Sequence, residues 1–205
     1  PGEQIMVFEN RYYDLYPSVS PENTASNVAV GMGTKGIETS KNATMEFALL
    51  KELLTNLLEA SRLTGLYEEK VETWKKMLGK VRQYKVNEDG AIREWIDDDY
   101  MDNYCHRHHS HLYPVFPGNE IDEEHPLYHA FVKAEDMRLQ FGLSDQSSWS
   151  LVFIAGIAAR MKRSETALKA IDTIARTCLM NNFFTVHNDW RRMGPIACAD
   201  FRVAP

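Results

Sequence analysis

The chain has 205 residues, of which 44% are hydrophobic and 25% charged, and its formal net charge at pH 7 is -6. This composition is typical of a globular protein with a real core. The acidic balance disfavours a nucleic-acid partner and acidic or phosphorylated substrates, because phosphate contacts need clustered Lys and Arg and no such stripe is present.

Cysteine spacing and hydropathy exclude two further classes. The three cysteines, Cys105, Cys178 and Cys198, form no CxxC pair, so neither a disulfide framework nor a thiolate zinc site is indicated. The longest apolar run, residues 151–159, is much shorter than the about 20 residues that a membrane-spanning helix needs. We therefore predict no membrane partner.

Residues 1–41 are predicted to form a long, ordered loop region. Pro17, Pro21 and the glycines at 31, 33 and 36 interrupt any helix. Loops of this length are usually functional or disordered, and the aromatic content of this segment argues against disorder. We expect it to be functional.

A helical hairpin is predicted next. After a possible cap at Asn42, leucines gather on one face of a helix that Gly65 ends. A second helix, residues 67–78, has apolar residues at helical spacing and Gly79 as its stop. The leucines of the first helix are Leu50, Leu53, Leu54, Leu57 and Leu58.

Three more helices are predicted after an acidic, turn-rich segment at residues 87–102. The third has Pro126 in its first turn and runs to Gly142. Ser147 and Ser148 open the fourth, whose residues 151–159 are apolar on all sides, which predicts an inner helix. Ser164 caps the fifth. Its apolar stripe consists of Leu168, Ile171, Ala175 and Leu179.

The resulting fold class is all-α, with helix pairs joined by long loops and no β-alternation. This pattern is typical of a toroid or a solenoid of helical hairpins. The chain has no short repeat of fixed length, which disfavours a solenoid. Five helices are an odd number and would not close a ring of hairpins.

The segment HRHHSHLYPVFPGNEI, residues 106–121, holds four of the seven histidines beside an arginine. Three interpretations compete. Imidazole is the commonest metal-ligand side chain, but the spacing is not that of a helical zinc motif. The histidines are otherwise buried structural residues with satisfied hydrogen bonds, or they line a substrate loop that donates hydrogen bonds to hydroxyl groups. The substrate loop is the favoured interpretation.

Four segments together resemble glycoside hydrolase family 95, the inverting α-L-fucosidases of the α/α toroid class. The resemblance implies that residues 1–205 are a single segment of an (α/α)6 toroid catalytic domain. The segments are PSVSPEN at 17–23, NATMEFALLKELLTNLLEAS at 42–61, NEDGAIREW at 87–95, and the 106–121 segment itself.

The resemblance implies hydrolysis of terminal α-1,2-linked L-fucose from a fucosylated oligosaccharide, with inversion and without cofactor or metal. Glu22 matches the general acid, and Arg107 and His108 match the sugar-contacting pair. In inverting enzymes the acid and the base stand roughly 6.5 to 9.5 Å apart. Glu22 must stay protonated near neutral pH, through low solvent access or a neighbouring carboxylate. Otherwise Glu22 merely caps a turn.

Other polar residues near these motifs keep two interpretations. Trp95 either stacks on a sugar face or belongs to the core, and Glu94 is not assigned a catalytic role. The acidic run at 97–99 with Asp102 is favoured as a solvated face, although Arg107 or His108 is a possible partner.

The resemblance stops short of the catalytic base. The family uses an asparagine pair upstream of SPEN and an aspartate in an FQID-type motif after the last irregular stretch, and neither is present. Asp189 and Asp200 are not promoted to that role. We therefore expect a chain cut at both ends, which self-associates or needs the rest of its catalytic domain because inner helices expose apolar faces. The parent protein is expected to be secreted or periplasmic.

Two alternatives remain open. One is a carbohydrate-binding or structural fragment without turnover. The other is a metal-dependent hydrolase that uses the cluster of His106, His108, His109 and His111.

Overall fold

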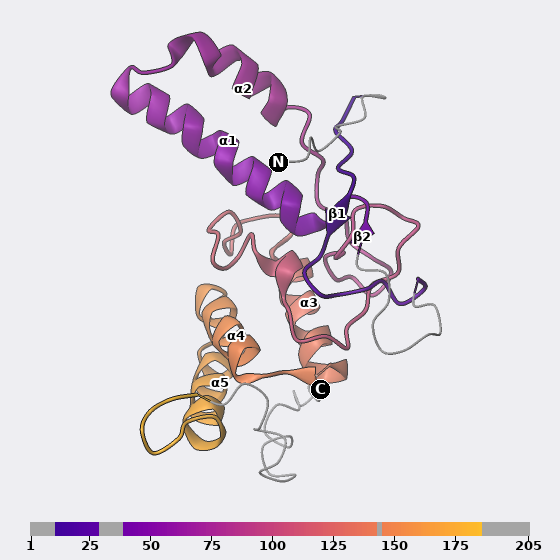
Figure 1. The fold of residues 1–205 in the computed structure, drawn as a ribbon, viewed down its shortest axis with the longest axis vertical. Coiled ribbons are helices and arrows are strands. Elements are labelled where there is room, and N and C mark those ends of the chain that lie inside the picture. Colours follow the sequence, from indigo (N-terminus) through magenta and orange to yellow (C-terminus); the bar gives the residue numbers. More distant parts are fainter. Residues whose placement is uncertain (1–10, 29–38, 143–144, 186–205) are drawn as a thin grey trace. The chain divides into compact units, whose positions relative to one another are not determined.

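A computed structural model of the chain describes residues 11–28, 39–142 and 145–185 (Figure 1). It divides into two compact units. The first unit comprises Pro1–Lys85 and Arg93–Asp102, and the second comprises Val86–Ile92 and Asn103–Pro205. We describe each unit by itself.

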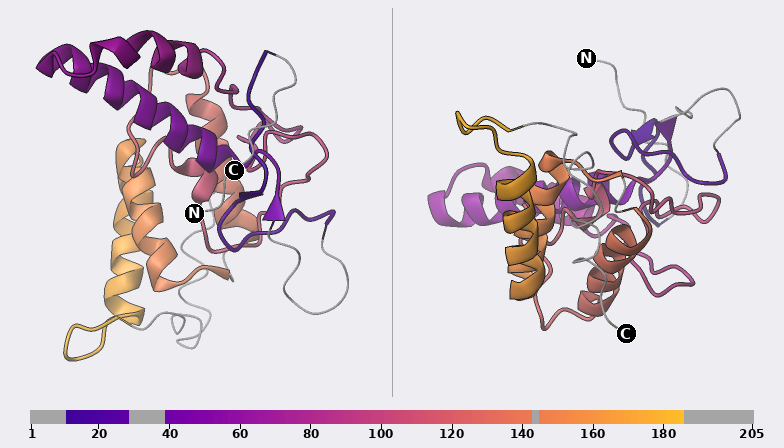
Figure 2. Two further views of the ribbon diagram at one scale, coloured as in Figure 1. Left: turned by 45° about the horizontal axis from the view of Figure 1, so that its top comes forward. Right: turned by 90° about the horizontal axis from the view of Figure 1, so that it is seen from below.

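The first unit is built on a helical hairpin. Helices α1 (Thr44–Thr64) and α2 (Val71–Leu78) run side by side in Figures 1 and 2, and the 3-10 helix Glu68–Lys70 joins them. Gly65 ends α1 in the left-handed conformation, with φ 69°, and its N–H donates to the Ser61 carbonyl. The structure confirms the predicted hairpin. It could be predicted because the residues that end its helices act locally.

A two-stranded ribbon and a small core complete the first unit. Strands β1 (Ser18–Val19) and β2 (Thr39–Ser40) pair antiparallel, so part of the predicted loop region is paired backbone. The core lies between α1 and the segments beside it. Its buried members are Tyr13, Phe47, Leu54, Val81 and Ile96.

The start of α1 differs from the prediction, because Asn42 is not the N-cap. Ala43 holds that position, without a side-chain cap bond, and its N–H donates to Ser18 Oγ at 2.8 Å. Asn42 adopts a left-handed φ of 60° and bridges backward: its Oδ1 accepts from Leu15 N and its Nδ2 donates to Asp14 Oδ1, both at 2.8 Å. Asn tolerates this conformation better than most residues.

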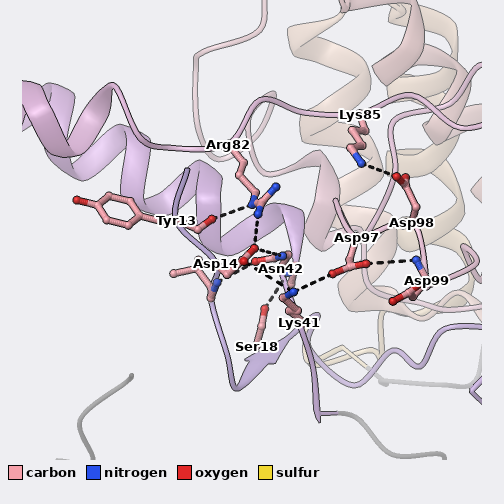
Figure 3. A network of polar contacts seen from close by, with 12 residues as sticks. Tyr13, Asp14, Ser18, Lys41, Asn42, Arg82, Lys85, Asp97, Asp98 and Asp99 are labelled. Atoms are coloured by element: carbon pink, nitrogen blue, oxygen red, sulfur yellow. Dashed lines mark hydrogen bonds and ion pairs between the residues drawn. The ribbon is translucent and has the colours of Figure 1, made fainter. Parts of the chain in front are cut away.

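Charged side chains surround Asn42 in the same corner (Figure 3). Asp14 pairs with Arg82, and Lys41 Nζ lies 3.8 Å from Asp14 and 3.5 Å from Asp97. The pKa of Asp14 is lowered: burial raises it, but the Asn42 hydrogen bond and the cations Arg82 and Lys41 outweigh that cost. The network fixes the chain where it enters α1.

The second unit contains the remaining α-helices of the described residues. They are α3 (Tyr128–Phe141), α4 (Ser148–Arg160) and α5 (Ser164–Thr177), with a 3-10 helix at Ser110–Leu112. Helices α4 and α5 run side by side in Figures 1 and 2. Their core comprises Leu139, Leu151, Ile154, Ala170 and Cys178.

Helix α4 begins as predicted. Ser147 is its N-cap and forms a capping box with Ser150, in which each side chain serves the other residue's backbone N–H. Pro126, which was predicted to lie in the first turn of the third helix, lies two residues before α3. Leu127 is the N-cap of that helix. Helix α5 is capped by Arg163, without a side-chain bond, rather than by Ser164.

The predicted apolar faces are only partly buried within the second unit. On α4, Leu151 and Ile154 are buried, whereas Trp149 and Val152 are more than half exposed. The predicted apolar stripe of α5 lies on the helix but is not its buried face, because Leu168 is 65% exposed. The reason is that small residues give the closest packing between helices. The buried residues of α5 are Ala167, Ala170 and Thr173.

The helical content confirms the all-α class for the described residues. None of their helices has the length and apolar character needed to cross a membrane.

Candidate functional site

The SPEN motif forms a tight turn in the first unit. The Asn23 N–H donates to the Ser20 carbonyl at 3.0 Å, which closes the turn over Pro21 and Glu22. Glu22 has a φ of 55°. Proline at the second position and a positive φ at the third are typical of a type II turn, in which glycine usually holds the third position. A glutamate at that position has a strained backbone conformation. Strained residues occur often at functional sites.

Both ends of this turn are tied to one buried carboxylate. Ser20 Oγ donates to Glu94 Oε1 and Asn23 Nδ2 donates to Glu94 Oε2, each at 2.6 Å. Ser20, Asn23 and Glu94 are all 2% exposed or less. Hydrogen bonds to a charged acceptor in such a place are short and strong. Glu94 therefore holds the turn at both ends.

The position of Glu94 is itself fixed by the start of α1. The Thr44 N–H donates to the Glu94 carbonyl at 2.9 Å, and Thr44 Oγ1 donates to the Arg93 carbonyl at 2.6 Å. The Glu94 N–H donates to Asp102 Oδ1 at 2.7 Å. We call the two hydrogen bonds from Ser20 and Asn23 to the Glu94 carboxylate the clamp. Its position is fixed by hydrogen bonds to the first residue of α1.

Trp95 belongs to the core, which decides between its two interpretations. Its side chain is 1% exposed, and its Nε1 donates to Ser40 Oγ at 2.9 Å. A ring buried in this way has no face free for a sugar.

Asp98, in the acidic run at 97–99, has a lowered pKa, first through its hydrogen bond with Lys85 and then through the charges of Lys85 and Arg93.

Glu22 itself is exposed at the tip of the turn. Low solvent access, one of the two means expected to keep it protonated, is therefore not supplied within its unit. The turn presents the carboxyl outward on a backbone that is anchored on both sides.

Arg107 and His108 lie in the second unit and are half-buried. The His108 N–H donates to His106 Nδ1 at 3.1 Å, and the two imidazole rings meet edge to face with centroids 5.1 Å apart. The His106 carbonyl accepts from Arg138 at 3.3 Å and from Gln146 at 3.2 Å. Buried Arg138 of α3 thus anchors the start of the loop.

The histidines that follow turn inward. His109 and His111 are buried, and neither nitrogen of His109 has a hydrogen-bond partner. Burial, then the charge of Arg138, lowers the pKa of both well below the ordinary value. Burial and Arg138 also lower the pKa of His106 to about 3. These imidazoles are neutral. His109 and His111 are buried, as the structural interpretation expects, but their hydrogen bonds are not all satisfied, because both His109 nitrogens and His111 Nδ1 lack partners.

No group of three or more His, Cys, Asp or Glu side chains in the described part of the chain is placed to hold a metal. The end of the loop instead packs on α4. The Phe116 ring meets Phe153 edge to face, with centroids 5.9 Å apart, and lies against Gly156. This contact places the loop on a helix.

The sequence-predicted residues fall in separate parts of the structure. Glu22 belongs to the first unit, and Arg107 and His108 belong to the second. Asp189 and Asp200 lie outside the described residues. Sequence reasoning missed the clamp by Glu94 and the anchor by Arg138. The only available signal was the pair of polar residues that flank Pro21 and Glu22.

The sequence agrees with a known family along nearly its whole length. The sequence model of the glycosyl hydrolase family 95 catalytic domain matches residues 3–196. The chain belongs to glycoside hydrolase family 95. The resemblance carried by the four segments is thereby confirmed.

One relative of the chain is alpha-L-fucosidase 2 of Arabidopsis thaliana. It is 30% identical over 189 aligned residues, and the match covers 83% of this chain and 21% of the relative. The chain thus spans about a fifth of the length of that relative.

Proposed function

We propose that the chain supplies the acid and the sugar-binding residues of a family 95 glycoside hydrolase, which releases terminal α-1,2-linked L-fucose with inversion. Glu22 is the general acid, and Arg107 and His108 bind the sugar. The observation that carries this proposal is the exposed Glu22 carboxyl on a strained turn fixed at both ends. Family membership and the Arabidopsis relative supply the reaction class.

The chemistry divides between donors and acid. The Glu22 carboxyl protonates the leaving oxygen while water attacks the anomeric carbon from the opposite face. Sugar bound against this exposed carboxyl excludes water, which favours its protonated form. Arg107 offers guanidinium N–H donors and His108 an imidazole, both suited to a neutral sugar rich in hydroxyls. No described residue is assigned the role of base.

The toroid belongs to this proposal as well. The α1–α2 and α4–α5 pairs are helical hairpins with outward apolar residues, as expected of hairpins that pack beside further hairpins.

Proton NMR of an α-1,2-fucosylated oligosaccharide incubated with the full-length protein tests the proposal. We expect β-L-fucose as the first product, and we expect Glu22→Gln to slow its release by about 10²- to 10⁴-fold, the contribution of a general acid. Glu69→Gln, an exposed glutamate of the 3-10 helix, is the matched control and should keep the wild-type rate.

The possible failures separate. Absence of free fucose means that the protein is not a fucosidase, and release of α-L-fucose first means that it retains configuration. Undiminished release by Glu22→Gln means that another group is the acid. Oligosaccharide binding without turnover, unaffected by Glu22→Gln, favours the carbohydrate-binding alternative.

A further inference from the structure

Glu94 is a buried carboxylate to which the proposed chemistry gives no part. Its side chain is 2% exposed, so it does not act on substrate from the surface. Its two oxygens accept hydrogen bonds from residues 74 and 71 positions earlier in the sequence. Those two residues, Ser20 and Asn23, flank the Pro21–Glu22 pair of the turn.

The hydrogen bonds of the clamp act on the turn that carries Glu22. The backbone bond from Asn23 N to the Ser20 carbonyl closes the turn, and Thr24 N donates to Asn23 Oδ1 at 2.9 Å. The Asn23 side chain therefore joins the turn to Glu94 on one side and to the following backbone on the other. A positive φ at a glutamate is strained backbone, which persists only when its surroundings hold it. Glu94 is the group that holds both ends.

We propose that Glu94 is a positioning residue, which acts through Ser20 and Asn23 to fix the direction in which the turn presents the Glu22 carboxyl. This inference rests on the proposed role of Glu22 as general acid. A general acid must reach the leaving oxygen within hydrogen-bond distance, and a misplacement of about 1 Å is enough to cost about a hundredfold in rate. Loss of Glu94 should therefore impair proton donation and leave sugar binding intact.

Leaving-group dependence distinguishes this role from a merely structural one. An oligosaccharide has a poor leaving group that needs protonation, whereas an aryl α-L-fucoside with an acidic phenol leaves with little help. In the full-length protein, Glu94→Ala should lower kcat on the oligosaccharide by about ten- to a hundredfold with KM unchanged. On the aryl fucoside the loss should stay below about threefold, because acid assistance contributes little there.

Conservative rescue sharpens the test. In Glu94→Gln the amide oxygen still accepts from Asn23, and the amide NH₂ donates to Ser20 Oγ, which is able to accept. This variant should keep kcat on the oligosaccharide within about fivefold of wild type, because neutral hydrogen bonds replace charged ones. Combined with Glu22→Gln, the Glu94→Ala change should add no further loss, since the acid is already gone.

Glu46→Ala is the matched control. Its carboxylate accepts from Val19 N at 3.2 Å, one residue before Ser20 and outside the turn at residues 20–23. Its loss removes a partly buried hydrogen bond of the same unit. Any change in kcat should be equal for the oligosaccharide and the aryl fucoside.

The outcomes distinguish the inference from the proposed function. If Glu22→Gln shows leaving-group dependence and Glu94→Ala does not, Glu22 is the acid and our inference is wrong. If neither substrate is hydrolysed by the wild type, the proposed function is wrong and the catalytic role of Glu94 is wrong with it.

Hydrogen exchange adds a readout that does not depend on turnover. Amide exchange in residues 20–24 should be faster in Glu94→Ala than in wild type, and unchanged in Glu46→Ala and Glu94→Gln. Equal exchange in Glu94→Ala and wild type overturns the inference whatever the kinetics show.

Discussion

Buried titratable side chains set the pH dependence of stability at the scale of single residues. Burial and Arg138 lower the pKa of His106, His109 and His111. A lowered histidine pKa means that the unfolded chain binds more protons than the folded chain below the ordinary value of about 6.5. Stability contributed by these groups is therefore present near neutral pH and lost as the pH falls through about 6.5.

His109→Leu tests this reasoning. Both His109 nitrogens lack partners, so we expect little stability loss near pH 7, where only an unsatisfied polar group is removed. Between about pH 5 and 6 the free energy of unfolding should depend on pH less steeply, by up to about 1.4 kcal/mol per pH unit. Urea denaturation at several pH values measures both. His129→Leu, at an exposed position of α3, should leave the slope unchanged, and an unchanged slope in His109→Leu would contradict the prediction.

Glu135 on α3 should have the opposite effect. The pKa of Glu135 is raised to about 7: burial raises it most, the charge of Arg163 lowers it, and the like charge of Asp136 raises it. Both carboxylates pair with Arg163. A raised carboxyl pKa gives stability that is fully present below about 4.5 and is lost as the pH rises through about 7.

Removal of this carboxyl should therefore steepen the rise of stability with pH. Glu135→Gln deletes this opposing group and leaves the three histidines, so the unfolding free energy should increase more between about pH 5 and 7 than in wild type. The same urea titrations measure it. Glu123→Gln, whose partner is Lys162 at an exposed site, is the control, and a slope equal to wild type in both variants would show that Glu135 does not titrate in this range.

At the scale of elements, the packing of the 106–121 loop on α4 requires a glycine at position 156 of that helix. A Cβ atom on Gly156 of α4 would lie 2.6 Å from Phe116 Cε1 and 2.7 Å from Phe116 Cδ1. Contacts so short force the ring to move, although helix propensity alone favours alanine. The glycine therefore makes room for the loop.

A double-mutant cycle separates the two effects. Gly156→Ala should destabilise the protein by about 1 to 3 kcal/mol through overpacking. In a Phe116→Ala background the same change should stabilise by up to about 1 kcal/mol, because only the gain in helix propensity remains. Urea denaturation gives all four values. The same sign in both backgrounds would rule out the packing role that we assign to Gly156.

At the scale of the whole molecule, the helices carry apolar side chains that their own units do not cover. Leu168 and Ile171 on α5 are 65% and 54% exposed, and Trp149 and Val152 on α4 are also more than half exposed. Clustered exposure of this kind marks surfaces that bind another protein surface or associate. The expected self-association of the chain stays a prediction.

Polar replacement on α5 tests that prediction. The chain by itself should sediment as concentration-dependent oligomers, and Leu168→Gln combined with Ile171→Gln should shift it toward the monomer, because apolar area no longer drives contact. Lys169→Gln changes an exposed position of the same helix and should have no effect. A wild-type chain that stays monomeric at all concentrations would show that these faces do not associate.

The sequence by itself determined the family, the helices and their stops. These depend on signals within a few residues: the SPEN and HRHHSHLY strings, Gly65 after α1, and the Ser147 cap of α4. Hydrogen bonds and steric limits within one turn of backbone are encoded locally, so they are readable from a string.

Only the tertiary structure decided what holds Glu22, which faces are buried, and what Trp95 does. The clamp on the Glu22 turn comes from a carboxylate more than 70 positions away, and α5 packs through alanines rather than through its larger apolar residues. Such contacts depend on which segments meet and how closely their backbones approach. Periodicity shows that a face is apolar, but the partner that covers it is set by packing in three dimensions.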